Sequence, residues 1–146
     1  MRQYDLYRIE EEVASYYYGR EQKFYGLFRE YSMSEGEFKE IVEGQIQYIT
    51  KKIPILPMHQ LLKEGLKRKD PLQNEGNIYW VHKDGKEKEF ARMELAEHKI
   101  SIWAEGDQDV ESIFFDLLRK MDNFLAIDLE NERYGWLKPW RERKYI

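Results

Sequence analysis

NIYWVHKDGKEKEFARMEL, residues 77–95, is the stretch that decides the fold class. Apolar and polar residues alternate on both sides of Asp84-Gly85, with the two-residue period of a strand that buries one face. Asp-Gly between two alternating runs is among the strongest short-range signals for a β-hairpin. The stretch therefore predicts two antiparallel strands, and HKISIWAEG, residues 98–106, predicts a third.

The residues before this hairpin mostly follow the longer period of helices. Residues 3–9 alternate loosely and predict a short strand. A helix over 10–18 follows, with Glu10–Glu12 in its first turn, where the helix dipole favours negative charge, and with Gly19 placed to end it. A second helix over 21–31 is predicted from one apolar stripe, formed by Phe24, Leu27, Phe28 and Tyr31.

A third helix is predicted over 34–50. Ser34 and Glu37 have the spacing of a capping box, and Met33 and Phe38 have that of a hydrophobic staple. The apolar side of this helix is expected to hold Phe38, Ile41, Val42, Ile46 and Ile49. Pro54 and Pro57 predict an extended linker, and Pro57 then suits the first turn of a fourth helix that contains Met58, Leu61, Leu62 and Leu66.

The remaining segments complete the predicted order of elements. Residues 67–77 are expected to form a polar connection, 107–120 a helix, and 124–129 and 133–137 two strands joined at Glu130-Asn131. Helices mostly precede strands instead of alternating with them, which favours an α+β fold with N-terminal helices packed on a mainly antiparallel sheet. A length of 146 residues suits a single compact domain over 1–146.

Composition narrows the classes of function. The chain has no cysteine, which excludes disulfides, thiol catalysis and thiolate zinc sites and fits a reducing cytosol. The segment MRQYDLYRIEEE lacks the apolar core of a signal peptide, and no apolar run is long enough to cross a bilayer. We therefore expect a cytoplasmic protein without a membrane partner. A net charge of −4 argues against direct nucleic-acid binding.

The residues that carry chemistry do not form a recognisable catalytic pattern. His59, His82 and His98 are scattered, and none has a serine, carboxylate or second histidine at the spacing of a catalytic or metal-binding motif. No glycine-rich phosphate loop occurs either. We therefore expect no enzyme activity, no catalytic residue, no metal and no cofactor.

The run Tyr16–Tyr18 is the most unusual feature of the first predicted helix. Adjacent helix positions point about 100° apart, so the three rings cannot all face one core. Val13 with Tyr17, and Ala14 with Tyr18, form neighbouring rows four residues apart. Either the phenols simply keep their tips in water, or Val13 and Tyr17 form the centre of a protein-binding face.

A second candidate surface is on the third predicted helix. Gln45 and Tyr48 lie three residues apart beside the apolar stripe. A tyrosine at such an edge with an amide neighbour is typical of an interface rim, and equally of any helix border.

Four blocks of the sequence together resemble the SirA family, the sporulation inhibitors of replication of endospore-forming relatives of Bacillus. They occur in the same order over nearly the whole chain, from about Tyr4 to Tyr145. None is a chemical motif, so their specificity comes from joint occurrence. The blocks are YYYGRE at 16–21, QIQYITKKIPILPMHQ at 45–60, ESIFFDLLRK at 111–120 and RYGWLKPWRER at 133–143.

The resemblance implies a role that composition does not. Members of this family bind domain I of the replication initiator DnaA, and they are neither enzymes nor cofactor proteins. The matching contact positions of the first helix are Val13, where the family has a larger phenylalanine, and Tyr17; Gln45 and Tyr48 match a second patch. Tyr17 is then expected to point outward, Ala14 and Tyr18 toward the core, and Tyr16 to lie at the border.

Two other functions remain open on the residues alone. The first is a small-molecule-binding or catalytic domain with an aromatic pocket formed by Trp80, Trp103, Trp136 and Trp140. The second is a regulator that contacts nucleic acid through the basic tail Arg141–Lys144. The oligomeric state, the affinity and the strand order do not follow from the sequence.

Overall fold

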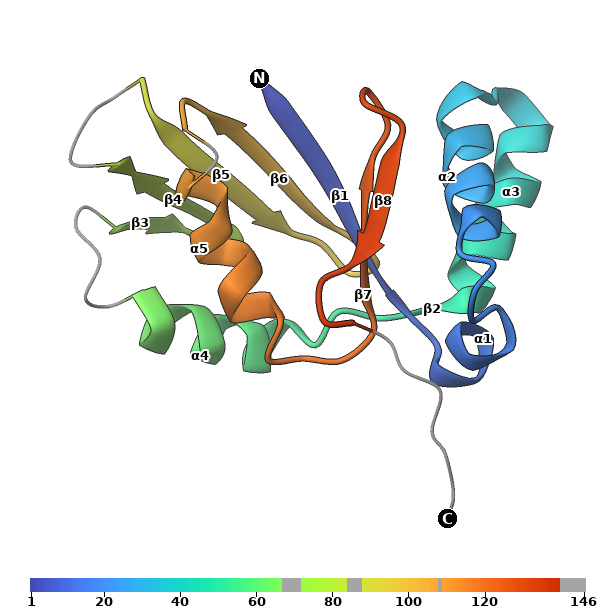
Figure 1. Cartoon of the computed structure of the whole chain (residues 1–146), viewed down its shortest axis with the longest axis horizontal. Coiled ribbons are helices and arrows are strands. Elements are labelled where there is room, and N and C mark those ends of the chain that lie inside the picture. The colour runs from blue at the N-terminus through green and yellow to red at the C-terminus, as the bar shows by residue number, and fades with distance from the viewer. Residues whose placement is uncertain (67–71, 84–87, 108, 140–146) are drawn as a thin grey trace, which may run out of the picture.

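The computed structural model describes residues 1–66, 72–83, 88–107 and 109–139 and has the predicted α+β fold (Figure 1). The helices are α1 (Glu11–Tyr16), α2 (Gln22–Met33), α3 (Gly36–Ile49), α4 (Ile55–Leu66) and α5 (Asp109–Leu118). The strands are β1 (Arg2–Ile9), β2 (Thr50–Lys51), β3 (Leu72–Glu75), β4 (Ile78–His82), β5 (Phe90–Leu95), β6 (Ile100–Glu105), β7 (Phe124–Asp128) and β8 (Arg133–Trp136).

The described strands form one sheet in the order β3-β4-β5-β6-β1-β7-β8, and every pairing among them is antiparallel. The predicted hairpin is confirmed, because β4 pairs with β5 from Ile78 opposite Glu94 to His82 opposite Phe90. Its Asp84-Gly85 turn lies outside the described residues. The first strand of the chain lies inside the sheet, between β6 and β7, and β2 pairs with its end.

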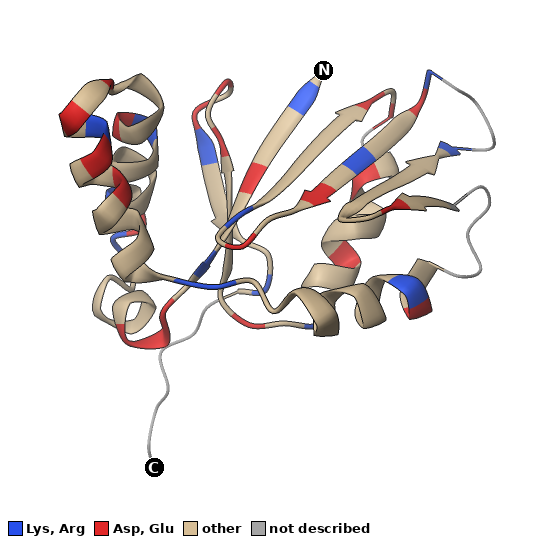
Figure 2. Cartoon of the chain, turned by 180° about the vertical axis from the view of Figure 1, so that it is seen from behind, with Lys and Arg blue, Asp and Glu red and all other residues tan. Residues whose placement is uncertain are grey.

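Two hydrophobic cores lie on opposite faces of β1. Leu6 belongs to the core beneath α4 and α5, whereas Tyr7 belongs to the core beneath α1, α2 and α3. This division follows from strand geometry, since successive side chains point to opposite faces. The N-terminal helices therefore stand at one end of the sheet and leave β4–β6 uncovered on that side (Figure 2).

The helices on the first face pack closely. Met58, Leu62 and Leu66 of α4 are fully buried, as is Phe114 of α5. Gly65 of α4 lies against the side chain of Leu117, so a Cβ at this position would collide with the leucine methyl groups. Glycine at position 65 thus allows α4 to approach α5.

The third helix differs from its prediction at its N-terminus. The helix begins at Gly36, Glu35 makes no side-chain cap, and the Ser34 hydroxyl donates back to the carbonyl of Glu30 in α2. The capping box with Glu37 is therefore wrong. The staple is wrong as well, because Met33 and Phe38 are both exposed. Gly36 has a φ of 66°, so the sharp turn between α2 and α3 takes the place of a capped entry.

The connection predicted over 67–77 contains a strand. Leu72–Glu75 pairs with β4 through a two-residue turn at Gly76-Asn77, where Gly76 has a φ of 58°. Leu-Gln-Asn-Glu carries little of the β-branched and aromatic enrichment that marks a strand, which is why its sequence indicated a loop. An exposed edge strand does not need that pattern, because its place is set by the neighbouring strand.

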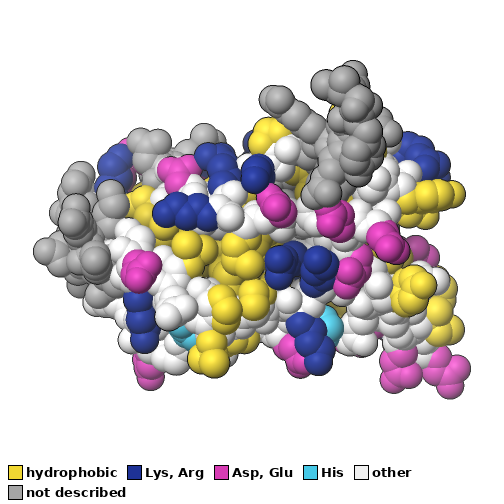
Figure 3. Space-filling model, turned by 90° about the horizontal axis from the view of Figure 1, so that it is seen from below, with side chains coloured by type: hydrophobic (Ala, Val, Ile, Leu, Met, Phe, Trp, Pro, Cys, Tyr) yellow, Lys and Arg dark blue, Asp and Glu magenta, His cyan; other side chains and the backbone are white. Residues whose placement is uncertain are grey.

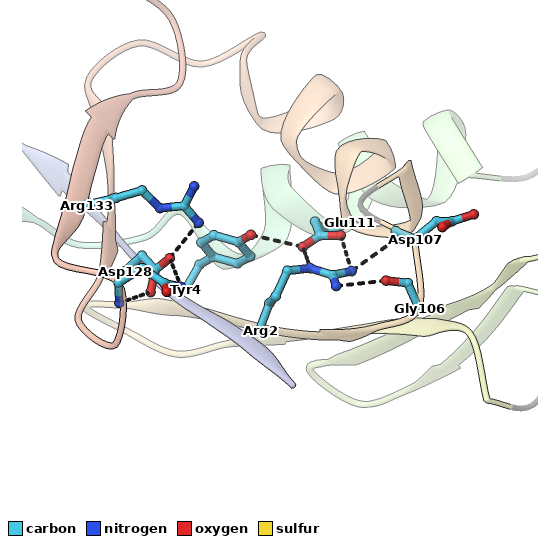
Figure 4. A network of polar contacts seen from close by, with 8 residues as sticks. Arg2, Tyr4, Gly106, Asp107, Glu111, Asp128 and Arg133 are labelled. Carbon is cyan, nitrogen blue, oxygen red and sulfur yellow. Dashed lines mark hydrogen bonds and ion pairs between the residues drawn. The ribbon is translucent and has the colours of Figure 1, made fainter.

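An ion pair between a partly exposed arginine and a buried carboxylate joins the start of β1 to the start of α5 (Figure 4). Arg2 donates from Nε and Nη2 to the two carboxylate oxygens of Glu111, at 2.6 and 2.8 Å. The same guanidinium donates to the carbonyls of Gly106 and Asp107, and the Tyr4 hydroxyl donates to Glu111 at 3.0 Å. The hydrogen bonds to Glu111 raise the pKa of Arg2, and burial together with the Glu111 carboxylate raises the pKa of Tyr4.

A second buried carboxylate orders the β7–β8 turn. Asp128 accepts from the backbone N–H and the side-chain amide of Asn131, at 3.2 and 2.9 Å, and from Arg133 at 2.9 Å. Burial by itself would raise the pKa of Asp128, but these hydrogen bonds and the nearby guanidinium outweigh it and lower the pKa. The turn that joins the last two strands thus depends on an ionised Asp128.

Replacement of Arg2 by alanine should lower the free energy of unfolding by about 3 kcal/mol, because it leaves the Glu111 carboxylate buried without its cation. Urea unfolding of the two proteins measures this difference. Lys52→Ala is the matched control, because its pair with Glu97 is exposed and should contribute less than about 1 kcal/mol. Equal losses in the two variants would contradict the role given to the pair of Arg2 with Glu111.

Asp128→Asn should remove stability that depends on pH. A carboxylate whose folded pKa is lowered stabilises the fold above its unfolded pKa of about 4, and this stabilisation disappears as pH falls through the folded value. The stability difference between the wild type and the variant should therefore be present at pH 7 and shrink as pH falls below about 4. Denaturant unfolding across this range tests it, and a difference that does not change with pH would refute it.

Candidate functional site

A groove of about 820 Å³ lies between the three N-terminal helices. We call it the α1–α3 groove. Aliphatic and aromatic side chains form most of its wall, and one carboxylate and one amide lie among them. The lining residues are Glu12, Val13, Tyr16, Tyr17, Leu27, Ile41, Gly44, Gln45, Tyr48 and Ile49.

The third helix forms one wall of the groove because it is apolar on more sides than the core can cover. Val42 and Ile46 are buried against α2 and the sheet. Ile41, Gln45 and Tyr48 follow one another at spacings of four and three residues, so they share a second face of α3. Ile41 is 59% exposed and Tyr48 84% exposed, so this face has no partner within the described residues.

The opposite wall is the short helix α1 and the turn after it. Ala14 is fully buried, whereas Val13 is half-buried and packs against the same core from the groove side. The acidic first turn predicted for this helix is present at Glu11 and Glu12. Glu12 lies in the groove wall, so one edge of the groove is negatively charged.

The three tyrosines after Val13 occupy three different environments. Tyr17 is half-buried, and its ring makes an edge-to-face contact with Phe24 of α2, with 5.4 Å between the ring centroids. Tyr16 is 69% exposed and packs edge-on against Tyr17, with ring centroids 4.9 Å apart. Tyr18 is 45% exposed and does not line the groove.

The expected orientations of these rings need correction. Tyr18 was expected to face the core with Ala14, but it is exposed, and Tyr17 is half-buried instead of simply outward. The physical reason is that α1 ends at Tyr16 and Tyr17 has φ −95° and ψ 14°, so the helical spacing does not continue to Tyr18. Tyr16, expected at the border, is the most exposed of the three rings.

Arg20 holds the two groove tyrosines in place. Its guanidinium carbon lies 5.1 Å from the Tyr16 ring centre and 5.2 Å from that of Tyr17. Arg20 also donates from Nη2 to the Tyr16 carbonyl at 2.7 Å. The contact combines cation–π attraction with a hydrogen bond across the turn, so the rings are ordered although one of them is exposed.

The structure brings all four sequence-predicted site residues together. Val13 and Tyr17 come from one wall of the groove and Gln45 and Tyr48 from the other, although about 30 residues separate the two pairs. Sequence reasoning missed Tyr16 and Ile41 as members of this surface. The sequence predicts Ile41 on the apolar side of α3. That apolar side is wider than one buried stripe, and this excess width is the signal that some of its residues lie outside the core.

Charge is distributed unevenly between this helical unit and the rest of the chain. Residues 10–49 carry nine carboxylates and four basic side chains, whereas the remaining residues carry nineteen carboxylates and twenty basic side chains. Figure 3 shows hydrophobic and acidic side chains side by side at the end of the molecule formed by α1–α3. The helical unit that contains the groove is therefore richer in carboxylates than the rest of the chain, and Glu12 is the carboxylate in the groove wall.

The tryptophans that the structure describes lie in two different places, which does not favour the common pocket of the alternative hypothesis. Trp80 and Trp103 flank Arg92 on the uncovered side of the sheet, and the Arg92 guanidinium lies 4.7 Å from the Trp103 ring centre. Trp136 lines a separate cavity of about 280 Å³ that neither of the other two reaches. Trp140 and the basic tail Arg141–Lys144 lie outside the described residues.

The histidines have structural surroundings where the structure describes their contacts. His59 Nδ1 lies 2.5 Å from the hydroxyl of the buried Tyr79, and Nε2 lies 3.0 Å from the Asn77 side chain, so the ring joins α4 to β4. Among the described residues, no group of three or more histidines and carboxylates could hold a metal ion. No helix in the described part of the chain is long and apolar enough to span a membrane.

Comparisons with known proteins identify the family of this chain. The family model described as "Sporulation inhibitor of replication protein SirA" matches residues 2–141. The chain belongs to this family. It is similar to the sporulation inhibitor of replication protein SirA of Bacillus subtilis (strain 168). The two sequences are 45% identical over an alignment of 148 positions, which covers 99% of each chain. The resemblance found in the sequence blocks is thereby confirmed.

The two tyrosines of the groove should respond differently to truncation. Tyr17→Ala removes a half-buried ring from Phe24 and should lower the free energy of unfolding by about 2 kcal/mol. Tyr48→Ala removes an exposed ring and should change it by less than about 0.5 kcal/mol. Denaturant unfolding measures both values, and a large loss in Tyr48→Ala would show that this ring is needed for folding.

Proposed function

We propose that this protein inhibits the initiation of DNA replication during sporulation by binding domain I of the initiator DnaA through the α1–α3 groove. Membership of the SirA family and the name of the Bacillus subtilis relative support the role in replication. One observation carries the site: Val13, Tyr17, Gln45 and Tyr48 line a single groove. The family resemblance of the sequence assigns partner contacts to the same four residues.

The physical basis of binding is exposed apolar surface held in a fixed shape. Tyr16, Ile41 and Tyr48 present large side chains to water. Burial of such apolar surface by a partner contributes about 25 cal/mol of favourable free energy per Å². The entropy and desolvation costs of association then reduce this gain. Tyrosine gives a large rigid contact with few rotatable bonds, which limits the entropy lost on binding. Tyr17 lies between this surface and the core, because its ring contacts the buried Phe24.

Val13 makes the groove of this chain wider than a larger residue at the same position would. The family position is expected to hold a larger residue, and valine here leaves more space between α1 and α3. The groove then accepts a bulkier apolar side chain from the partner. Gln45 adds an amide that donates and accepts hydrogen bonds, so it supplies orientation where the other residues supply apolar area.

The mechanism that we propose is occlusion and requires no chemical step. A domain that covers a surface of DnaA domain I excludes other proteins or neighbouring DnaA molecules from the same surface. A standard interface buries about 800 Å² on each partner, which a groove with exposed flanking residues can supply. The protein would act in the cytoplasm, where DnaA meets the chromosome, and without direct contact to nucleic acid.

Titration of the full chain with isolated DnaA domain I tests this function. Tyr48→Ala and Ile41→Ala should each raise Kd at least tenfold, equivalent to about 1.4 kcal/mol, because both remove exposed groove anchors. Both side chains are exposed, so the variants should remain folded. Calorimetry or fluorescence anisotropy gives the Kd.

Leu56→Ala is the matched control for this titration. Leu56 is a large apolar residue, 78% exposed, that does not line the groove, so its truncation should leave Kd unchanged. If the wild type binds domain I and both groove variants bind as tightly as it does, the site is wrong. If the wild type does not bind domain I at all, the proposed partner is wrong.

A further inference from the structure

Two basic residues meet at the end of β1 in an unusual arrangement. Arg8 of β1 is directly opposite Lys51 of β2 in an antiparallel pair. Side chains at such positions lie on the same face of the sheet with Cβ atoms about 5 Å apart. Like charges placed directly opposite each other in a sheet repel and destabilise it.

Neither cation is neutralised by the described part of the protein. Eight other basic residues form ion pairs, including Arg2 with Glu111 and Lys52 with Glu97, whereas Arg8 and Lys51 have no carboxylate within ion-pair distance among the described residues. The Nε atom of Arg8 is buried and has no hydrogen-bond partner. Because Nε is buried, an external anion can reach this guanidinium only at its terminal N–H groups, where the anion would compensate the partly desolvated charge.

An exposed apolar side chain follows this pair in the chain. Figure 3 shows that, on the face seen from below, Lys and Arg side chains border a patch of hydrophobic ones. The chain passes from Lys51 through Ile53, which is buried, into α4, whose first turn exposes Leu56. An apolar contact is thus available a few residues from the two positive charges.

We propose that Arg8 and Lys51 bind a side-chain carboxylate of an acidic, partly apolar segment of a second protein partner. Arg8 supplies planar N–H donors to the carboxylate and Lys51 adds a second positive charge, while Leu56 packs against an apolar residue of the same segment. The bound carboxylate relieves the repulsion between the two cations.

Charge favours a protein segment over a nucleic acid. The unpaired site holds two cations only, and the chain as a whole has a net charge of −4. A nucleic-acid backbone is a continuous series of phosphates and requires a longer basic track. Glu10 directly follows β1 and would repel a continuous series of phosphates, whereas a peptide can present a carboxylate to the two cations and direct its other side chains away from Glu10.

The site is separate from the α1–α3 groove. Arg8 alternates along β1 with Tyr7 and Ile9, which face the core beneath α1–α3, so its side chain points to the opposite face of the strand. Neither Arg8 nor Lys51 lines the groove. A partner at this site can be bound while the groove is occupied, and the inference does not depend on the function proposed above.

NMR titration of the full chain with an acetylated Glu-Glu-Leu-Glu-Glu peptide amide tests the proposal. The peptide should shift the Arg8 Nε–H and Lys51 backbone signals in a saturable manner. In Arg8→Gln/Lys51→Gln the Kd should rise at least tenfold. Since the substitutions remove a repulsion, the thermal midpoint of the variant should be equal to or higher than that of the wild type, whereas a purely structural role would lower it.

The control variant Lys63→Gln/Lys88→Gln removes the same charge from two exposed positions and should bind the peptide as the wild type does. The proposal is overturned if the peptide does not shift Arg8 and Lys51, if both variants lose affinity equally, or if the thermal midpoint falls. It is also overturned if a ten-residue oligothymidylate or phosphatidylglycerol vesicles shift these signals when the peptide does not.

Discussion

The rest of the structure depends on one strand that is hydrogen-bonded on both edges and carries buried side chains on both faces. β1 pairs with β6 over Arg2–Leu6 and with β7 over Asp5–Arg8, so it closes the centre of the sheet. Side chains on its two faces belong to the two cores, and Arg2 at its start donates a hydrogen bond to Glu111 of α5. Since α1 begins one residue after Glu10, whose N–H donates to the Ile49 carbonyl at 2.8 Å, the same strand sets both walls of the groove.

The groove exists because three short helices share a small area of sheet. Phe24 and Phe28 of α2 and Val42 and Ile46 of α3 fill the core against β1 and β7, and little sheet remains for α1. α1 therefore contributes one fully buried side chain, Ala14, and its other apolar residues, Val13 and Tyr16, line the groove. A binding surface built on packed helices in this way is preorganised, so association loses less conformational entropy than it would on a flexible loop.

Much of the fold could be predicted from sequence because its signals are local. The pairing of β4 with β5, the stripe of Phe24 and Phe28, and the last two strands follow from the period of apolar residues. Leu72–Glu75 could not be found, since an edge strand takes its conformation from β4. The groove was found only in part: the family resemblance pointed to Val13, Tyr17, Gln45 and Tyr48. The end of α1 at Tyr16, which decides where Tyr17 and Tyr18 point, depends on tertiary packing.

The uneven division of charge has a consequence for long-range behaviour. The carboxylate excess of residues 10–49 is concentrated at one end of the longest axis of the molecule, and the remainder is nearly balanced (Figure 1). The protein therefore has a permanent electric dipole moment. In the field of a positively charged body it rotates during diffusion until the helical end leads, which raises the fraction of productive collisions. This alignment acts over roughly one Debye length, about 8 Å at physiological salt, and fades as ionic strength rises.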